Sequence, residues 1–237
     1  EGAFVYVKKG IKLDKLVQIL FVNTNHEESR MMQTRNLFVV EDLAEAQIFE
    51  RHQAFNQGHV FSNSVTESSV GNQAHFKHFK LQNDLDSSSM VDSTFVKQGA
   101  NSSALVDTFA FSGELVRNNL HFEFTGMHAE AHMDAITLLK GKSLVDHHTF
   151  VDHAVPHCQS NQLYKGIYDE KSKGVFNGKV MVRKDAQKTN AFQQNNNLLL
   201  SDFSSIDTKP QLEIFADDVA CSHGCTIGQL DEEALFY

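Results

Sequence analysis

The sequence predicts an all-β protein of elongated shape, and three observations favour this fold class. Short apolar runs rich in Val, Phe, Ile and Leu recur along the chain, as strands require. Only two prolines are present, so nearly every residue can donate to a strand ladder. Apolar residues also return at a step of sixteen, which is typical of a solenoid whose turns stack about 4.8 Å apart. Coincidence in a β-rich chain stays open as the alternative, because the step is not constant.

The predicted strands follow one another with scarcely any helical periodicity before Gln229. The run 120–124 alternates apolar and polar side chains, as a half-buried strand does. The run of Gln and Asn at 193–197 is interpreted as a turn whose amides hydrogen-bond to neighbouring coils. In order, the predicted strands are 4–7, 16–22, 37–40, 47–49, 93–96, 105–111, 120–124, 135–139, 148–151, 175–176, 180–182, 198–200 and 212–215.

The sixteen-residue step makes one specific prediction about packing. It links Val182, Leu198 and Ile214, and the same spacing occurs earlier in the chain. In a solenoid, equivalent side chains align in columns from one coil to the next. We therefore expect these three side chains to stack in one buried column.

Length, charge and cysteine content narrow the class of protein. At 237 residues the chain is one large β domain or two ordinary ones. A formal net charge of −9 argues against binding to nucleic acid, which needs a basic face. No apolar run approaches the roughly 20 residues of a membrane span, so no membrane partner is expected. Three cysteines are too few for a disulfide framework, and they indicate a reducing compartment such as the cytoplasm.

The two ends of the chain indicate a core fragment of a longer protein. The chain opens at Glu1, inside a strand-like run, rather than at a methionine. It ends at Tyr237, where a helical pattern has only just begun. Residues 1–228 are therefore assigned to a β core, and residues 229–237 to the truncated beginning of a C-terminal helix.

The first cluster of metal-binding residue types spans 146–158 and holds four histidines and a cysteine besides Asp146. Such side chains can bind zinc or iron. In a strand, however, His147 and His148 point to opposite faces, and the spacing matches no common zinc pattern. We favour a structural role, in which the polar side chains hydrogen-bond along a turn column, over a metal site.

The second cluster is Cys221, His223 and Cys225. In an extended strand these side chains share one face at intervals of about 6.6 Å, which is too far apart for one tetrahedral ion. Either the segment bends at Gly224, or another chain completes the set. Thiolate and imidazole suit iron, zinc or an iron–sulfur cluster. A strand end with buried thiols is the alternative, and the spacing alone does not decide between them.

No complete catalytic set can be identified in the sequence. A Cys–His pair could act as a nucleophile, but no feature supplies an oxyanion hole or an orienting group. No Gly-rich phosphate-binding loop is present, so the chain is not expected to hydrolyse ATP. Two enzymatic alternatives stay open: a β-helix enzyme that acts on polysaccharide through paired carboxylates, and a metal-dependent hydrolase that uses the 146–158 cluster.

Several segments resemble the SufB/SufD family, whose members are subunits of the SUF machinery for iron–sulfur cluster assembly. Residues 36–42, Asn-Leu-Phe-Val-Val-Glu-Asp, resemble a run found in that family. The most specific similarity is C-terminal, in Cys-Ser-His-Gly at 221–224 and Leu-Asp-Glu-Glu at 230–233, and it is closer to the SufD branch than to SufB. Further similar segments are 145–153, 156–158, 164–166, 175–179 and 185–189.

The resemblance implies a right-handed parallel β-helix and a non-catalytic scaffold on which iron and sulfide are joined. It implies a SufB-like partner, which pairs through the C-terminal end of the β-helix, and a SufC ATPase, which docks on the C-terminal helices of the resulting SufBCD complex. Because that helical region has barely begun at Tyr237, we expect weak SufC binding by this chain. No cofactor is expected to stay bound, and iron or an iron–sulfur cluster would be held only transiently in the complex.

The resemblance also assigns site residues. It implies that His223 faces a SufB cysteine at the interface, as a metal ligand completed by the partner chain, with Cys221 as its neighbour. Cys225 stands where many relatives have Ala, so no ligand role is implied for it. A homodimer through the same region is expected when SufB is absent. The residues expected at the dimer interface are Leu212, Ile214, Ala216 and Val219.

Overall fold

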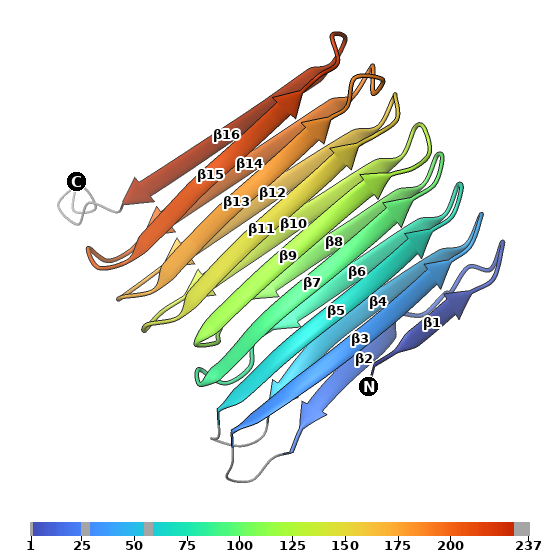
Figure 1. Ribbon diagram of the computed structural model, residues 1–237. Coiled ribbons are helices and arrows are strands. Elements are labelled where there is room, and N and C mark those ends of the chain that lie inside the picture. The colour runs from blue at the N-terminus through green and yellow to red at the C-terminus, as the bar shows by residue number, and fades with distance from the viewer. Residues whose placement is uncertain (1, 25–28, 55–58, 230–237) are drawn as a thin grey trace.

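The structure is a computed structural model that describes residues 2–24, 29–54 and 59–229. These residues form a right-handed parallel β-solenoid (Figure 1). The odd-numbered strands build one eight-stranded sheet in chain order, and the even-numbered strands build a second one. All neighbouring strands in both sheets are parallel. The described residues contain no helix. The predicted all-β class and the expected parallel β-helix are therefore confirmed.

Each coil of the solenoid contributes one strand to each sheet. β1 and β2 lie at one end of the molecule, and β15 and β16 lie at the other (Figure 1). The strands are β1 (Phe4–Val7), β2 (Val17–Asn23), β3 (Arg30–Val40), β4 (Glu45–Ala54), β5 (Val60–Val70), β6 (His75–Gln82), β7 (Ser88–Gln98), β8 (Ser103–Ala110), β9 (Leu115–Phe124), β10 (Glu130–Leu139), β11 (Leu144–His153), β12 (Gln159–Tyr168), β13 (Lys173–Val182), β14 (Asn190–Leu199), β15 (Ser205–Ile214) and β16 (Ala220–Gln229).

The coil repeat is about twice the sixteen-residue step seen in the sequence. Strand pairing gives coils of 26 residues between β7 and β9 and up to 33 residues between β1 and β3. Val182 and Ile214 are paired on β13 and β15, but Leu198 lies on β14 in the opposite sheet. Of the three side chains only Val182 is buried. The prediction of one buried column is therefore wrong, because a step of sixteen crosses from one sheet to the other.

All the predicted strands overlap observed ones, although β5, β6, β12 and β16 have no counterpart in the list of predicted strands. The 193–197 run is not a turn, because it lies within β14. Its amides do bond to the neighbouring coil: Gln193 Nε2 donates to Gln162 Oε1, and Asn195 Nδ2 donates to Tyr164 O, both at 3.3 Å. Gln229, the first residue of the predicted helix, closes β16, and residues 230–237 lie outside the described part of the chain.

One turn recurs at the six connections from an odd strand to the following even strand between β3 and β14. Its outermost residue has a positive φ, and the next residue is small and buried. Hydroxyl groups on two of the buried residues close their turns: Ser102 donates to Gly99 O at 2.7 Å and Thr189 donates to Ala186 O at 2.9 Å. The Cys158 thiol contacts Pro156 O at 3.6 Å. The positive-φ residues are Leu43, Gln73, Asn101, His128, His157 and Lys188, followed by Ala44, Ala74, Ser102, Ala129, Cys158 and Thr189.

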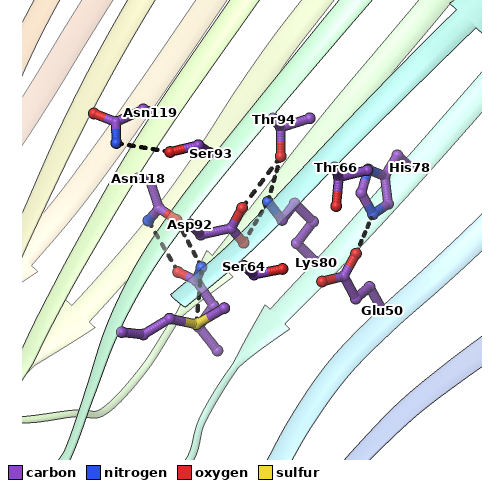
Figure 2. A network of polar contacts seen from close by, with 12 residues as sticks. Glu50, Ser64, Thr66, His78, Lys80, Asp92, Ser93, Thr94, Asn118 and Asn119 are labelled. Carbon is purple, nitrogen blue, oxygen red and sulfur yellow. Dashed lines mark hydrogen bonds and ion pairs between the residues drawn. The ribbon is translucent and has the colours of Figure 1, made fainter. Parts of the chain in front are cut away.

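The interior between the two sheets is apolar in part and polar in part. Fully buried phenylalanines, among them Phe38, Phe76 and Phe122, fill one portion of it. In β5, β6 and β7 the inward-facing positions are largely polar (Figure 2). There Gln82 and Asn118 exchange two amide hydrogen bonds, of 2.6 and 3.0 Å. Such bonds satisfy polar atoms that would otherwise be costly to bury.

Charged groups are also buried in this polar region, and they are paired (Figure 2). The imidazoles of His52 and His78 each lie 3.1 Å from a carboxylate oxygen of Glu50. Burial alone would raise the pKa of Glu50, but the two imidazoles outweigh it and hold this pKa well below its usual range. Lys80 Nζ lies 2.5 Å from Asp92 Oδ2 and joins β6 of one sheet to β7 of the other.

The buried Lys80–Asp92 pair leads to a stability prediction. Asp92→Asn would leave the Lys80 ammonium buried without its anion, which typically costs about 3–5 kcal/mol. We expect a large fall in the free energy of unfolding, measured by urea denaturation. The matched control is Glu123→Gln, which breaks the exposed 3.2 Å pair between Lys97 and Glu123 and should cost no more than about 1 kcal/mol. An equal fall in the free energy of unfolding in the two variants would show that the buried pair matters no more to stability than the exposed pair.

Candidate functional site

The C-terminal end of the solenoid is open. β15 pairs only with β13, and β16 pairs only with β14, so each has one unpaired edge in the described part of the chain. Inward-facing positions that are buried along β13 and most of β14 are exposed or half-buried here, except for Ile206 at the start of β15. The last coil therefore forms a mouth, lined by the inner faces of β15 and β16.

The predicted cluster Cys221, His223 and Cys225 lies in this mouth. In register these residues pair with Ala191, Gln193 and Asn195, which are buried inward-facing residues of β14. Since side chains alternate along a strand, all three members of the cluster point to the inner face. His223 and Cys225 are exposed, and Cys221 is half-buried.

The geometry of β16 decides one question that the sequence left open. The strand pairs with β14 without interruption from Ala220 to Gln229, so the chain does not bend at Gly224. Successive members of the cluster thus stay about 6.6 Å apart, as alternate residues of a strand do. The described residues contain no group of three His, Cys, Asp or Glu side chains that could hold a metal ion. Within this chain, the cluster is an incomplete set of ligands.

The two thiols of the mouth differ in their surroundings. Burial raises the pKa of Cys221, so its sulfur is held as the neutral thiol rather than as the metal-binding thiolate. Cys225 Sγ lies 2.8 Å from Thr208 Oγ1, a hydrogen bond that joins β16 to β15 across the mouth. Thr208 was not singled out in the sequence, because its contact depends on how closely two strands of opposite sheets approach each other.

The residues expected at a dimer interface lie around the same mouth. Leu212 and Val219 are half-buried against the core, and Ile214 is exposed. Ala216 differs, because its side chain is 8% exposed and belongs to the core beneath the β15–β16 turn. The turn directs this small side chain inward, and its place at a dimer interface stays a prediction.

The 146–158 cluster is dispersed by the fold. His147 is buried with its Nε2 3.0 Å from Thr137 Oγ1, and burial lowers its pKa to about 3. His153 is buried with its Nε2 2.9 Å from Ser160 Oγ. His148 lies on the outer face, paired with Asp146 at 2.9 Å, and His157 is exposed at a turn. These side chains do not converge on one point, which supports the predicted structural role over a metal-dependent hydrolase.

Two carboxyls lie on neighbouring strands on the outer face of the even sheet. Asp107 and Asp134 are register neighbours on β8 and β10 and are half-buried. Burial, with a smaller contribution from Asp134, raises the pKa of Asp107 to about 6. The pair lies on the face of a sheet between Phe79 and Leu163, with which it is in register. No sequence signal marked it, because the two residues are far apart in the chain.

Comparison with known proteins identifies the family. Residues 21–237 match the family described as SUF system FeS cluster assembly, SufBD core domain. The chain belongs to the SufBD family. It is 35% identical to an iron–sulfur cluster assembly SufBD family protein of Synechocystis over all of this chain and 54% of that protein. It is 31% identical to the iron–sulfur cluster assembly protein SufD of Escherichia coli over 98% of this chain and 56% of that protein.

The similarity extends to more distant SufBD proteins. The protein named SufD of Bacillus subtilis is 23% identical over all of this chain and 54% of its own length. The chain thus spans about half the length of these relatives. The described residues contain no helix that could cross a membrane.

The Asp107–Asp134 pair gives a prediction about pH. A pKa raised in the folded state means that ionisation opposes folding, so the stability that depends on neutral Asp107 is present at low pH and lost as the pH rises through about 6. Asp107→Asn should therefore raise the thermal midpoint at pH 8, and the gain should vanish below about pH 4. In Asp134→Asn, the NMR-titrated pKa of Asp107 should fall but stay raised, because burial is the larger cause. A pKa near 4 for Asp107 in the wild-type protein would contradict the prediction that burial raises it.

Proposed function

We propose that this chain is the β-helical core of a SufD-like, non-catalytic scaffold subunit for iron–sulfur cluster assembly. The observation that carries the proposal is the Cys221–His223–Cys225 set at the open end of the solenoid. Its members face inward on a strand that has no neighbour on one side among the described strands, and they are too far apart to hold one ion. Such a set suits a site that is completed by a second chain.

The unpaired edge of β16 fits a SufB-like partner. Ala220 donates its N–H to Thr189 O of the neighbouring β-ladder, and a parallel strand directs alternate backbone groups to each side. The backbone groups of Cys221, His223 and Cys225 therefore face the free edge, where a second strand can bind. β15 is less suited to this, because Pro210 lies in it and lacks an N–H.

His223 is the ligand proposed for this chain. A neutral imidazole can bind iron or donate a hydrogen bond to a cluster sulfide. Cys221 has a secondary role, because burial holds its sulfur as a thiol, so the thiolate is assigned to the partner. Iron and the cluster are cargo of the complex and are not resident cofactors.

The remaining parts of the proposal concern the wider complex. A SufC-like ATPase would supply ATP hydrolysis, because this chain has no Gly-rich phosphate-binding loop. The proposed location is the cytoplasm, since the three cysteines are free and thiol chemistry needs reducing conditions. A polysaccharide-active enzyme is not favoured, because the Asp107–Asp134 pair lies on an open sheet face and not in a cleft.

The main functional experiment tests His223 in the full-length protein with its SufB- and SufC-like partners. His223→Ala should leave the thermal midpoint and partner pairing nearly unchanged, because the side chain is exposed, while the rate of cluster reconstitution falls sharply. Cys221→Ala should have a smaller effect, and His75→Ala, at an exposed site on β6, should have none. Normal reconstitution in His223→Ala, or unfolding of that variant, would make His223 a structural residue.

The free edge of β16 gives a second experiment. The isolated chain should dimerise, and Ile227→Pro should weaken the dimer, because it removes an N–H that faces the free edge. The fold should survive, since proline is tolerated where the missing donor faces solvent. Thr226→Pro is the contrast, because it removes a donor to β14 and should destabilise the fold, and Ile227→Ala controls for the side chain. Sedimentation and thermal unfolding measure both effects. A wild-type chain that stays monomeric at high concentration would refute edge pairing.

A further inference from the structure

The recurring turn brings two histidines of adjacent coils together. His128 and His157 occupy the outermost, positive-φ position of the turns that precede β10 and β12. Each is followed by a small buried residue, Ala129 or Cys158. The backbone of the second turn is also held by the next coil, because His157 N–H donates to Gln187 O at 2.9 Å. The solenoid repeat therefore places the two imidazoles side by side on a firm backbone.

The two rings are close, exposed and otherwise unengaged. Their centroids are 4.8 Å apart, and their planes are inclined by 24°. Both residues are exposed. Neither side chain makes a hydrogen bond or an ion pair with another residue in the described ranges. At the other turns of this column the same position carries residues that offer no second imidazole, namely Leu43, Gln73, Asn101 and Lys188.

This arrangement suits a divalent transition-metal ion. Imidazole nitrogen binds zinc at about 2.1 Å, so two nitrogens on a tetrahedral ion lie about 3.4 Å apart. Rotation about the exposed side-chain bonds of His128 and His157 can close their nitrogens to that separation without moving the turns. Water can occupy the remaining positions of the ion. Imidazole is a borderline ligand that suits zinc, copper, nickel and ferrous iron.

We propose that His128 and His157 form a two-imidazole binding site for a divalent transition-metal ion on the turn edge of the solenoid. The site is separate from the C-terminal mouth, since it lies on the turns before β10 and β12. It takes both of its protein ligands from one chain, and it needs no partner to form. Its two ligands are held at consecutive turns, so the backbone loses little freedom when the ion binds.

The test is calorimetric titration of the chain with zinc chloride. All titrations use a background of Cys221→Ser, His223→Gln and Cys225→Ser, so that the C-terminal cluster cannot contribute. The background chain should bind one zinc ion. Adding either His128→Gln or His157→Gln should weaken zinc binding at least about tenfold. Loss of a residue that only hydrogen-bonds to a metal ligand already lowers metal affinity by about that factor, and here the ligand itself is lost. Adding His75→Gln, an exposed histidine on β6, should change nothing.

A second readout distinguishes ligation from a structural effect. With copper(II) in place of zinc, the electron paramagnetic resonance spectrum of the background chain should show coupling to two nitrogens, and to fewer in either single variant. The proposal is overturned if the background chain binds no zinc, if both single variants bind as tightly as the background, or if sedimentation shows that zinc bridges two chains. None of these outcomes depends on cluster assembly.

Discussion

The parallel backbone ladder between coils is the constraint on which the rest of this structure depends. Each strand lies about 4.8 Å from its neighbour, and the register is continuous from β1 to β15 in one sheet and from β2 to β16 in the other. Each paired strand residue therefore has a defined neighbour in the next coil. The turn column, the buried amides of Gln193 and Asn195 and the inward direction of His223 all follow from this register.

The ladder fixes neighbours within a sheet, but it does not by itself fix how the two sheets face each other. Polar contacts across the interior supply part of that information. Lys80 and Asp92 pair across the interior between opposite sheets, and His147 reaches Thr137 in the same manner. Apolar side chains of similar volume can be as stable as a buried ion pair. We infer that these pairs specify the relative position of the sheets more than they add stability.

The sequence predicts the fold class and the residues of the candidate site, but it does not predict which face of several strands is buried. In β6 the inward positions are taken by Phe76, His78 and Lys80, while Phe79 faces outward. In β5 the inward positions are mainly Ser and Thr, so apolar alternation gives no signal there. The sixteen-residue step misled for a related reason, because apolar positions recur in both strands of a coil and the sequence cannot tell one sheet from the other.

The residues of the candidate site could be predicted from the sequence, but their position at the open end of the solenoid could not. The spacing of Cys221, His223 and Cys225 correctly puts them on one face of a strand. That this face belongs to the open end of a solenoid depends on the number of coils and on which strand comes last. The Cys225–Thr208 contact and the Asp107–Asp134 pair depend on strand register, and a single sequence contains no information on register between distant segments.

In β16 the same three residues offer their side chains to the mouth and their backbone groups to the free edge. The register in which a partner strand pairs with β16 therefore also determines whether its ligands reach those of this chain. If a partner slipped along β16 by two residues, it would keep its backbone hydrogen bonds but carry its own ligands about 6.6 Å past His223. The register of pairing along this edge thus sets the distance between the partner's ligands and His223. A partner that binds in the wrong register would be tightly held and yet unable to complete the site, so recognition here has to discriminate position along the strand as well as chemical identity.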